Sequence, residues 1–152
     1  MTDKKICIAC SAGGHLTEAL QLQEAWKGKP HFYISDKRIN ALSLSKKERV
    51  YFILPPRRSY FRTGIAFIQT FFIFLKERPD IIISTGAEIG YPALIIGWIF
   101  KKKTIYIESL ARVNSPSLCG KMVYGKITHF YVQWSEGKKW FPKAKYVGSV
   151  FD

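Results

Sequence analysis

Short apolar runs alternate along this chain with longer segments in which apolar residues recur at helical spacing. The apolar runs, bounded by turn residues, predict buried strands at 4–10, 31–35, 50–54, 80–85, 104–108 and 130–133. Helical spacing with Gly and Pro boundaries predicts helices over 16–26, 60–78, 92–100 and 121–127. The stretch between 36 and 49 is polar, and no element is predicted in it.

The predicted strands are apolar throughout and are separated by helices. Strands of this kind are covered on both faces, so the order predicts an α/β fold, a Rossmann-like parallel sheet with helices on both faces. The 152 residues fit one domain, residues 1–152. Ligands of such sheets bind at the carboxyl ends of the strands. The turns after Cys10, Thr85 and Ile107 are therefore candidate sites.

The first of these turns carries Ser11, Gly13, Gly14 and His15. Two glycines allow close approach of a ligand to the backbone, and the start of a helix presents amides, an arrangement that suits a phosphate or diphosphate. The third glycine of a dinucleotide fingerprint and the Lys-Ser/Thr of a P-loop are missing, so a plain tight turn remains an alternative. His15 has the chemistry of a general base, or it caps the helix.

The other two turns each present a carboxylate. Glu88 follows Gly86 and is suited to binding sugar hydroxyls or accepting a proton, unless it is simply a solvated turn residue. Glu108 ends a predicted strand, with Arg112 one helical turn later. This pair either binds substrate hydroxyl and phosphate or forms a structural ion pair.

The charge balance points to anionic partners. The formal net charge is +13 and the pI is about 9.8, which is compatible with nucleic acid, anionic lipid headgroups or phosphorylated substrates. No helix-turn-helix, RRM or zinc-finger pattern appears, so a nucleic-acid partner is not expected. Cys7, Cys10 and Cys119 have no accompanying His cluster and are expected to be buried, reduced thiols. Neither a metal nor a cofactor is expected.

The segment around 60–78 is apolar nearly all round and has cationic ends. Such a helix is typical of an interfacial membrane position, although a core helix with one apolar face remains an alternative. No signal peptide is evident, and no run approaches the roughly 20 apolar residues that span a bilayer. We therefore expect a cytoplasmic protein that lies peripherally on the anionic inner face of the cell membrane. The expected membrane-contacting residues are Arg57, Arg58, Arg62, Phe67, Phe71 and Phe74.

Taken in order, the three turns resemble the motifs of one known family, as do residues 118–121, 131–134 and 146–148. That family is the acceptor and membrane subunit of the two-part N-acetylglucosamine transferase of dolichol-linked oligosaccharide assembly. Its bacterial PssD-type relatives serve capsule and exopolysaccharide synthesis. The likeness covers essentially the whole chain. The sequence differs from the eukaryotic members of the family, which carry an N-terminal transmembrane anchor before the first strand.

The resemblance implies the N-terminal half-domain of a GT-B glycosyltransferase, with the nucleotide-sugar bound by a separate donor-binding subunit. It implies a polyprenyl-diphosphate-linked sugar as acceptor and transfer with inversion, active only with the partner. His15 or Glu88 would then accept the proton of the attacking hydroxyl. Acceptor or phosphate contacts would come from Ser11, Gly13, Gly14, Gly86, Glu108 and Arg112. A non-catalytic scaffold that recruits and activates the partner is the alternative.

Overall fold

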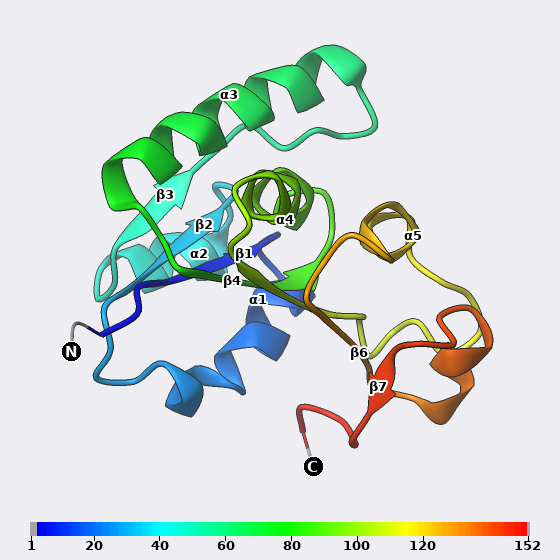
Figure 1. Cartoon of the computed structure of the whole chain (residues 1–152). Helices are drawn as coiled ribbons and strands as arrows, with labels where there is room; N and C mark the ends of the chain where they lie inside the picture. The colour runs from blue at the N-terminus through cyan, green and yellow to red at the C-terminus, as the bar shows by residue number, and fades with distance from the viewer. Residues whose placement is uncertain (1–2, 152) are drawn as a thin grey trace.

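A seven-stranded sheet runs through the middle of the molecule (Figure 1). The structure is a computed structural model that describes residues 3–151. The strand order is β3-β2-β1-β4-β5-β6-β7, and every neighbouring pair is parallel. The strands are β1 (Ile6–Cys10), β2 (His31–Ser35), β3 (Val50–Phe52), β4 (Ile81–Gly86), β5 (Lys103–Ile107), β6 (His129–Val132) and β7 (Lys145–Tyr146).

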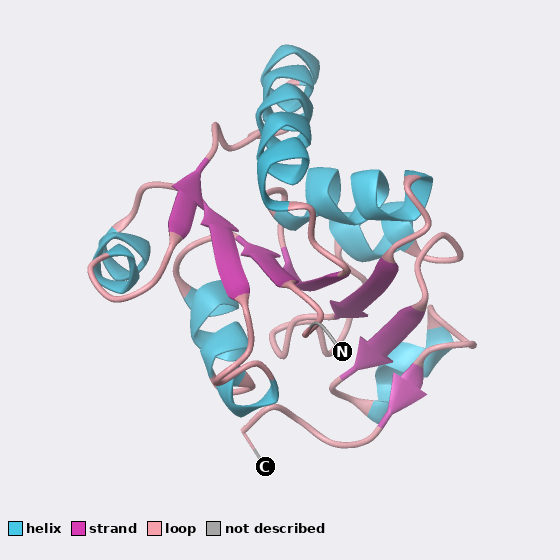
Figure 2. Ribbon diagram, turned by 60° about the vertical axis from the view of Figure 1, so that its left-hand side comes forward, coloured by secondary structure: helices cyan, strands magenta, loops and turns pink. Residues whose placement is uncertain are grey.

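Helices cover both faces of this sheet (Figure 2). One face carries α1 (Gly14–Leu20), the 3-10 helix η1 (Gln23–Ala25) and α2 (Ile39–Ser45). The other carries α3 (Tyr60–Glu77), α4 (Gly90–Ile99) and α5 (Leu118–Val123). A second 3-10 helix, η2 (Ser135–Lys139), joins β6 to β7. The predicted Rossmann-like α/β fold is confirmed.

The continuous apolar run of β1 is explained by burial on both sides. Cys7 and Ala9 pack into the core beneath α3 and α4, whereas Ile6, Ile8 and Cys10 pack toward α1. Cys7, Cys10 and Cys119 are free and buried, as expected. Burial raises the pKa of the Cys10 thiol to about 12, so this group stays protonated and acts as a small apolar side chain.

Some predicted bounds were wrong, each for a local reason. The helix expected over 16–26 ends at Leu20 and is followed by η1, because the chain turns to bury Trp26, whose indole N–H donates to the Tyr33 hydroxyl at 2.9 Å. The helix expected over 121–127 begins at Leu118, because the Ser117 hydroxyl caps it by accepting from the Gly120 amide at 2.9 Å. Neither α2, η2 nor β7 was predicted. Residues 1, 2 and 152 of the expected domain lie outside the described residues.

The long helix α3 has two different apolar faces. Its inner face buries Ala66, Thr70, Phe74 and Glu77 against the rest of the protein. The expected membrane contact through Phe74 is wrong, because this ring shares a stripe with Ala66 and Thr70, is 6% exposed and belongs to the core. Phe67 is half-buried against Tyr91, with the ring centroids 5.5 Å apart.

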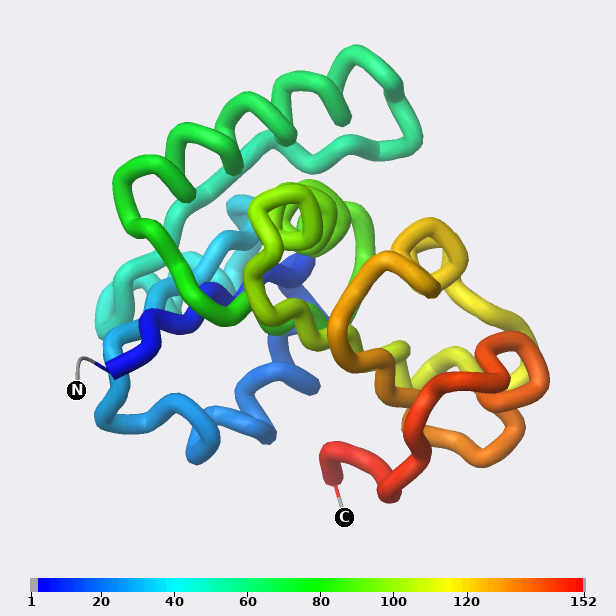
Figure 3. Tube along the Cα trace, in the orientation of Figure 1, coloured from blue at the N-terminus to red at the C-terminus, as the bar shows by residue number. Residues whose placement is uncertain are grey.

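The outer face of α3 is apolar and open to solvent. Phe61, Ile68 and Phe72 are 78%, 59% and 62% exposed. Phe71 is 38% exposed and stacks on Phe100, which follows α4, at 6.3 Å between centroids. Figure 3 shows α3 crossing the molecule on the side away from the C-terminal segment. No helix formed by residues 3–151 combines the length and the apolar character needed to span a bilayer.

The strand order reverses between β1 and β4. From β1 the sheet grows to β2 and β3 on one side, and from β4 it grows to β5, β6 and β7 on the other. The connections after β1 and β4 therefore leave toward opposite faces, which makes this the switch point of the sheet. Doubly wound folds bind ligands in the crevice at the carboxyl edge beside such a switch point. Two of the three candidate turns meet there.

Candidate functional site

The candidate site is built where β1 and β4 end side by side, with Cys10 paired to Gly86. After β1 the chain passes through Gly13 into α1, and after β4 it passes through Gly86 to α4. Four of the predicted site residues, Gly13, Gly14, His15 and Gly86, therefore lie at the switch point. Ser11 lies at the end of β1 and is buried.

His15 and Thr85 bridge the crevice. The His15 Nδ1 lies 3.0 Å from the Thr85 carbonyl oxygen, and the Thr85 hydroxyl donates to the His15 carbonyl at 2.6 Å. A carbonyl oxygen only accepts, so this contact assigns the proton of the neutral imidazole to Nδ1 and leaves the Nε2 lone pair free. The side chain is 30% exposed, so it can be reached from the crevice.

Gly86 and Gly13 are required by the backbone of these turns. Gly13 has φ +92° and Gly86 has φ +114°, conformations that side chains with a Cβ rarely adopt. A Cβ on Gly86 would lie 3.3 Å from both the His15 Nδ1 and the Tyr106 hydroxyl. The glycine therefore lets β4 approach the imidazole closely.

The loop after β2 fastens the Gly13 turn. The Ala12 amide donates to the Asp36 carboxylate at 2.7 Å, and the Asn40 side chain pairs with the Gly13 amide and carbonyl at 2.9 and 3.0 Å. Arg38 donates to the Ala12 carbonyl and, at 2.8 Å, to Asp36. The amide expected to be free for phosphate at Gly13 is thus already used. Sequence reasoning missed these residues, although a polar segment directly after a strand at the same sheet edge was a usable signal.

The Glu88 carboxylate is also engaged. One oxygen accepts from the Arg57 amide at 2.7 Å and the other from the Arg58 amide at 3.0 Å. The backbone of both arginines lies in the left-handed region, with φ 48° and 56°. A non-glycine residue in this region costs on the order of 1 kcal/mol, so two in succession need an anchor of this kind. The role of Glu88 as a proton acceptor stays a prediction. Its observed contacts are those of a carboxylate that fixes the loop of Arg57 and Arg58.

The third predicted turn carries a buried carboxylate. Glu108 is 3% exposed and accepts from the Tyr106 hydroxyl at 2.8 Å and from the Ser117 hydroxyl and amide at 2.5 and 2.9 Å. Burial raises the pKa of the Tyr106 phenol well above its ordinary value, and nearby Glu108 adds to the rise, so the phenol remains a donor. The ion pair considered between Glu108 and Arg112 is not among the interactions of residues 3–151, and the Arg112 side chain is exposed.

Glu18 ties α1 to the turn after β5, a role that sequence reasoning missed. Its buried carboxylate accepts from the Leu110 amide at 2.7 Å, the Gln133 side chain at 2.8 Å and the Ser109 hydroxyl at 3.2 Å. The position is on the inner face of an amphipathic helix, where a carboxylate must be satisfied by hydrogen bonds. This contact fixes the helix that carries His15.

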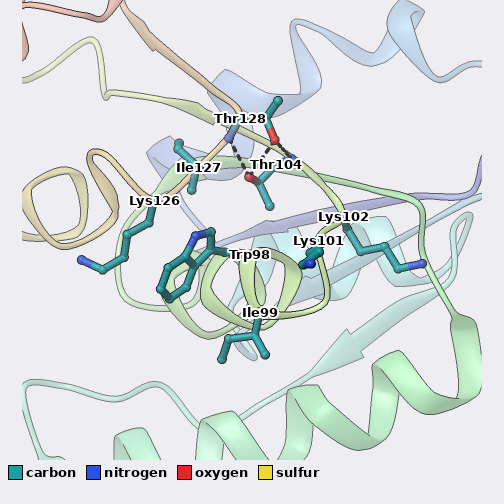
Figure 4. Close-up of a pocket in the computed structure, with 8 residues that line it drawn as sticks. All are labelled: Trp98, Ile99, Lys101, Lys102, Thr104, Lys126, Ile127 and Thr128. Atoms are coloured by element: carbon teal, nitrogen blue, oxygen red, sulfur yellow. Dashed lines mark hydrogen bonds between the residues drawn. The ribbon is translucent and has the colours of Figure 1, made fainter.

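A separate hollow lies at the opposite edge of the sheet, away from the crevice. It has a volume of about 510 Å³ and lies between the end of α4 and the segments that lead into β5 and β6 (Figure 4). Trp98, three lysines and two threonines are among its lining residues, and the threonines hydrogen-bond to each other there. Throughout the part of the chain that the structure describes, His, Cys, Asp and Glu side chains form no group suited to a metal ion.

Known proteins resemble this chain over nearly its whole length. A family model described as "Oligosaccharide biosynthesis protein Alg14 like" matches residues 6–150. The UDP-N-acetylglucosamine transferase subunits ALG14 of Rattus norvegicus and Homo sapiens are each 28% identical to it, over 95% of this chain and 82% of the relative. The subunit of the same name from Saccharomyces cerevisiae is 39% identical over 77 residues, which are 50% of this chain and 32% of the relative.

Solved structures share the fold at low sequence identity. The UDP-GlcNAc 2-epimerase of Methanocaldococcus jannaschii superposes with a TM-score of 0.76 at 13% identity, over 95% of this chain and 45% of that one. MurG of Acinetobacter baumannii gives 0.76 at 13%, over 96% and 46%. The chain thus spans less than half the length of these proteins. The expected fold, one half of a GT-B architecture, is confirmed.

Proposed function

The chain belongs to the family of Alg14-like oligosaccharide biosynthesis proteins, and from this premise we propose that it is the acceptor-binding subunit of a two-component glycosyltransferase. A separate polypeptide supplies the nucleotide-sugar-binding half. The proposal is supported by the names of its relatives, "UDP-N-acetylglucosamine transferase subunit", and by the match to 82% of the length of the subunits from Rattus norvegicus and Homo sapiens.

The observation that carries the proposal is the position of His15. Its Nδ1 is turned to the Thr85 carbonyl, which leaves the lone pair of Nε2 free, and the side chain is 30% exposed at the switch point. In the proposed reaction Nε2 accepts the proton of an acceptor hydroxyl. The hydroxyl oxygen bonds to the anomeric carbon of the donor sugar, and the bond from that carbon to the nucleotide diphosphate breaks with inversion. The proton thus goes to His15, the sugar to the acceptor oxygen, and the nucleotide diphosphate leaves.

We propose a saccharide linked to polyprenyl diphosphate as the acceptor. In this arrangement the sugar lies at the glycine turns of the switch point, and the polyprenyl chain lies along the exposed apolar face of α3. We also propose a role in capsule or exopolysaccharide assembly, which the resemblance of the motifs to the bacterial members of the family implies. The lipid-linked saccharide that accumulates in a strain lacking the gene would identify the acceptor.

We propose that the outer face of α3 rests on the inner face of the cell membrane. Phe61, Phe72 and Leu75 are 78%, 62% and 53% exposed, and Phe100 after α4, which stacks on Phe71, is 49% exposed. Phe71 contributes through its stacked, partly exposed ring. The excess of cations favours an anionic headgroup layer.

The decisive test is reconstitution with the donor-binding partner. The two purified proteins, separately and mixed, are assayed with nucleotide-sugar and lipid-linked saccharide in vesicles. We expect transfer only from the mixture. Substantial transfer by the partner alone would make this chain a scaffold. Transfer by this chain alone would contradict the proposal that a separate polypeptide binds the nucleotide-sugar.

A further inference from the structure

Arg57 and Arg58 form an unusual loop that contacts the turn between β4 and α4. They are consecutive, both are non-glycine residues, and both have left-handed backbones with φ 48° and 56°. Such a pair presents its side chains in directions that ordinary loop conformations do not. The Glu88 carboxylate holds the loop through both amides, at 2.7 and 3.0 Å.

The loop is braced from a second side. The Arg62 Nε donates to the Pro55 carbonyl at 2.8 Å, and the Ser59 hydroxyl accepts from the Arg62 amide at 3.3 Å at the start of α3. The loop is therefore fixed both to the turn after β4 and to α3. Its shape does not depend on any partner of the two guanidinium groups.

The two guanidinium groups are free to bind a ligand. Both residues are exposed, and within residues 3–151 neither side chain has a carboxylate within ion-pair distance or a hydrogen bond. Arg38 and Arg49, by contrast, are paired with Asp36 and Glu77 at 2.8 Å. A rigid backbone that carries two unpaired guanidinium groups is suited to a ligand with closely spaced negative charges.

The position of the pair identifies the ligand. On one side, Glu88 belongs to the turn that begins at Gly86, which lies against His15. On the other side, α3 begins at once with Tyr60 and Phe61, which are 98% and 78% exposed. These contacts thus lead from the proposed proton acceptor to the paired cations and from them to the apolar face. A lipid-linked sugar has the matching order of sugar, diphosphate and hydrocarbon chain.

We propose that Arg57 and Arg58 bind the diphosphate of the lipid-linked acceptor and that Glu88 is the positioning residue that orients them, not the proton acceptor. The identity of the acceptor rests on the proposed function. The diphosphate of the nucleotide-sugar has the same chemistry. The apolar face that begins directly beside the arginines favours the lipid-linked diphosphate.

Binding to the purified full chain tests the arginines, with farnesyl diphosphate, farnesyl monophosphate and UDP as probes. The variant R57G/R58G removes both charges, and glycine keeps the left-handed backbone without strain. The matched control is R78G/K101G, because Arg78 and Lys101 are also exposed and left-handed, with φ 50° and 58°, at the far ends of α3 and α4.

We expect R57G/R58G to weaken farnesyl diphosphate binding at least tenfold, with a Tm equal to or above that of the wild type. The wild type should prefer the diphosphate to the monophosphate, and R78G/K101G should bind within twofold of the wild type. Unchanged farnesyl diphosphate binding in R57G/R58G, no binding by the wild type, or an equal loss in R78G/K101G overturns the proposal. A loss confined to UDP would assign the pair to the donor and overturn it as well.

The assay with the partner tests Glu88. E88Q keeps the side-chain size and one accepting oxygen, so we expect a raised KM for the acceptor, a nearly unchanged kcat and an unaltered pH profile of kcat. A kcat that collapses at saturating acceptor, with one limb of the pH profile lost, would make Glu88 the proton acceptor. Neither result bears on the proposal that acceptor and donor are bound by separate subunits, because the reconstitution tests that proposal separately.

Discussion

His15 and Thr85 are joined by two hydrogen bonds across the switch point of the sheet, one from the imidazole to the Thr85 carbonyl and one from the Thr85 hydroxyl to the His15 carbonyl. The first selects the imidazole tautomer, and the second fixes the backbone that carries it. The end of β4 thus holds one side chain of α1 in one orientation. Such pre-organisation is what a general base requires.

Replacing His15 tests this role directly. We expect H15A to lower transfer by about 10²- to 10⁴-fold, the usual contribution of a general base, in an assay with the partner. The control is H129A, because His129 opens β6 at the opposite edge of the sheet. H129A should retain activity, and both variants should remain folded by circular dichroism. A turnover of H15A close to that of the wild type would remove His15 from the mechanism.

Gly86 makes the close approach to His15 possible, which G86A tests. Its new Cβ would lie 3.3 Å from the His15 Nδ1, so we expect reduced transfer as well as a lower Tm. The control G125A carries the same kind of strain, since Gly125 has φ +85° but no atom within 4 Å of the new Cβ. Both changes should cost roughly 1 kcal/mol of stability. Only G86A should lose activity, and equal activity in the two variants would contradict the role of the contact.

The pattern of the sequence was sufficient for the fold and for two of the turns that meet at its switch point. Apolar runs between helices indicate a parallel sheet, and glycine turns after two of the strands indicate its functional edge. The break after Leu20 was missed because it depends on the burial of Trp26 against Tyr33, a contact between two elements. The spacing of apolar residues within one segment cannot predict a contact with another element.

The site was predicted less completely than the fold, because several of its residues act on distant backbone. Asn40 matters through the Gly13 amide, and Glu88 through the amides of Arg57 and Arg58, partners that lie 27, 31 and 30 positions away. The residue type shows that a carboxylate can accept a proton or bind a ligand. It does not show that both of its oxygens already accept hydrogen bonds from the backbone. The same limit explains Phe74, since the composition of α3 does not say which of its phenylalanines face the core.

The outer face of α3 provides a test of membrane binding. We expect F61D/F72D to reduce co-sedimentation with vesicles of anionic phospholipid at least tenfold, because both rings are exposed and the new charges are repelled. The control I39D/L42D changes two exposed apolar residues of α2, 84% and 42% exposed, on the other face of the sheet. This control should bind like the wild type. An equal loss in both pairs would indicate binding by charge alone.

Phe74 should affect stability and not membrane binding. We expect F74A to destabilise the protein by about 3–5 kcal/mol, the usual cost of removing a buried Phe side chain. The comparison is F72A on the exposed face, which should cost less than about 1 kcal/mol. Urea unfolding measures both. A small cost for F74A would contradict its placement in the core.

Glu77 links the end of α3 to β3 and to the start of β1, and it should make stability depend on acid pH. Burial alone would raise its pKa, but hydrogen bonds from Tyr51, Lys5 and Arg49 outweigh burial and leave the pKa of this carboxyl below its ordinary value. A carboxyl whose pKa is lower in the folded state stabilises the fold above its unfolded pKa of about 4.3. That contribution is lost as the pH falls through the lower, folded-state pKa.

The variant E77Q isolates this effect, because the amide cannot titrate and keeps the size of the side chain. We expect E77Q to be less stable than the wild type by about 2 kcal/mol at pH 7, the usual value of hydrogen bonds to a charged group. The difference should shrink as the pH is lowered from 5 to about 3, because the wild-type carboxylate is then protonated. Thermal unfolding of both proteins across this range measures it. A difference that stays constant down to pH 3 would show that the stabilisation does not come from the ionised carboxylate.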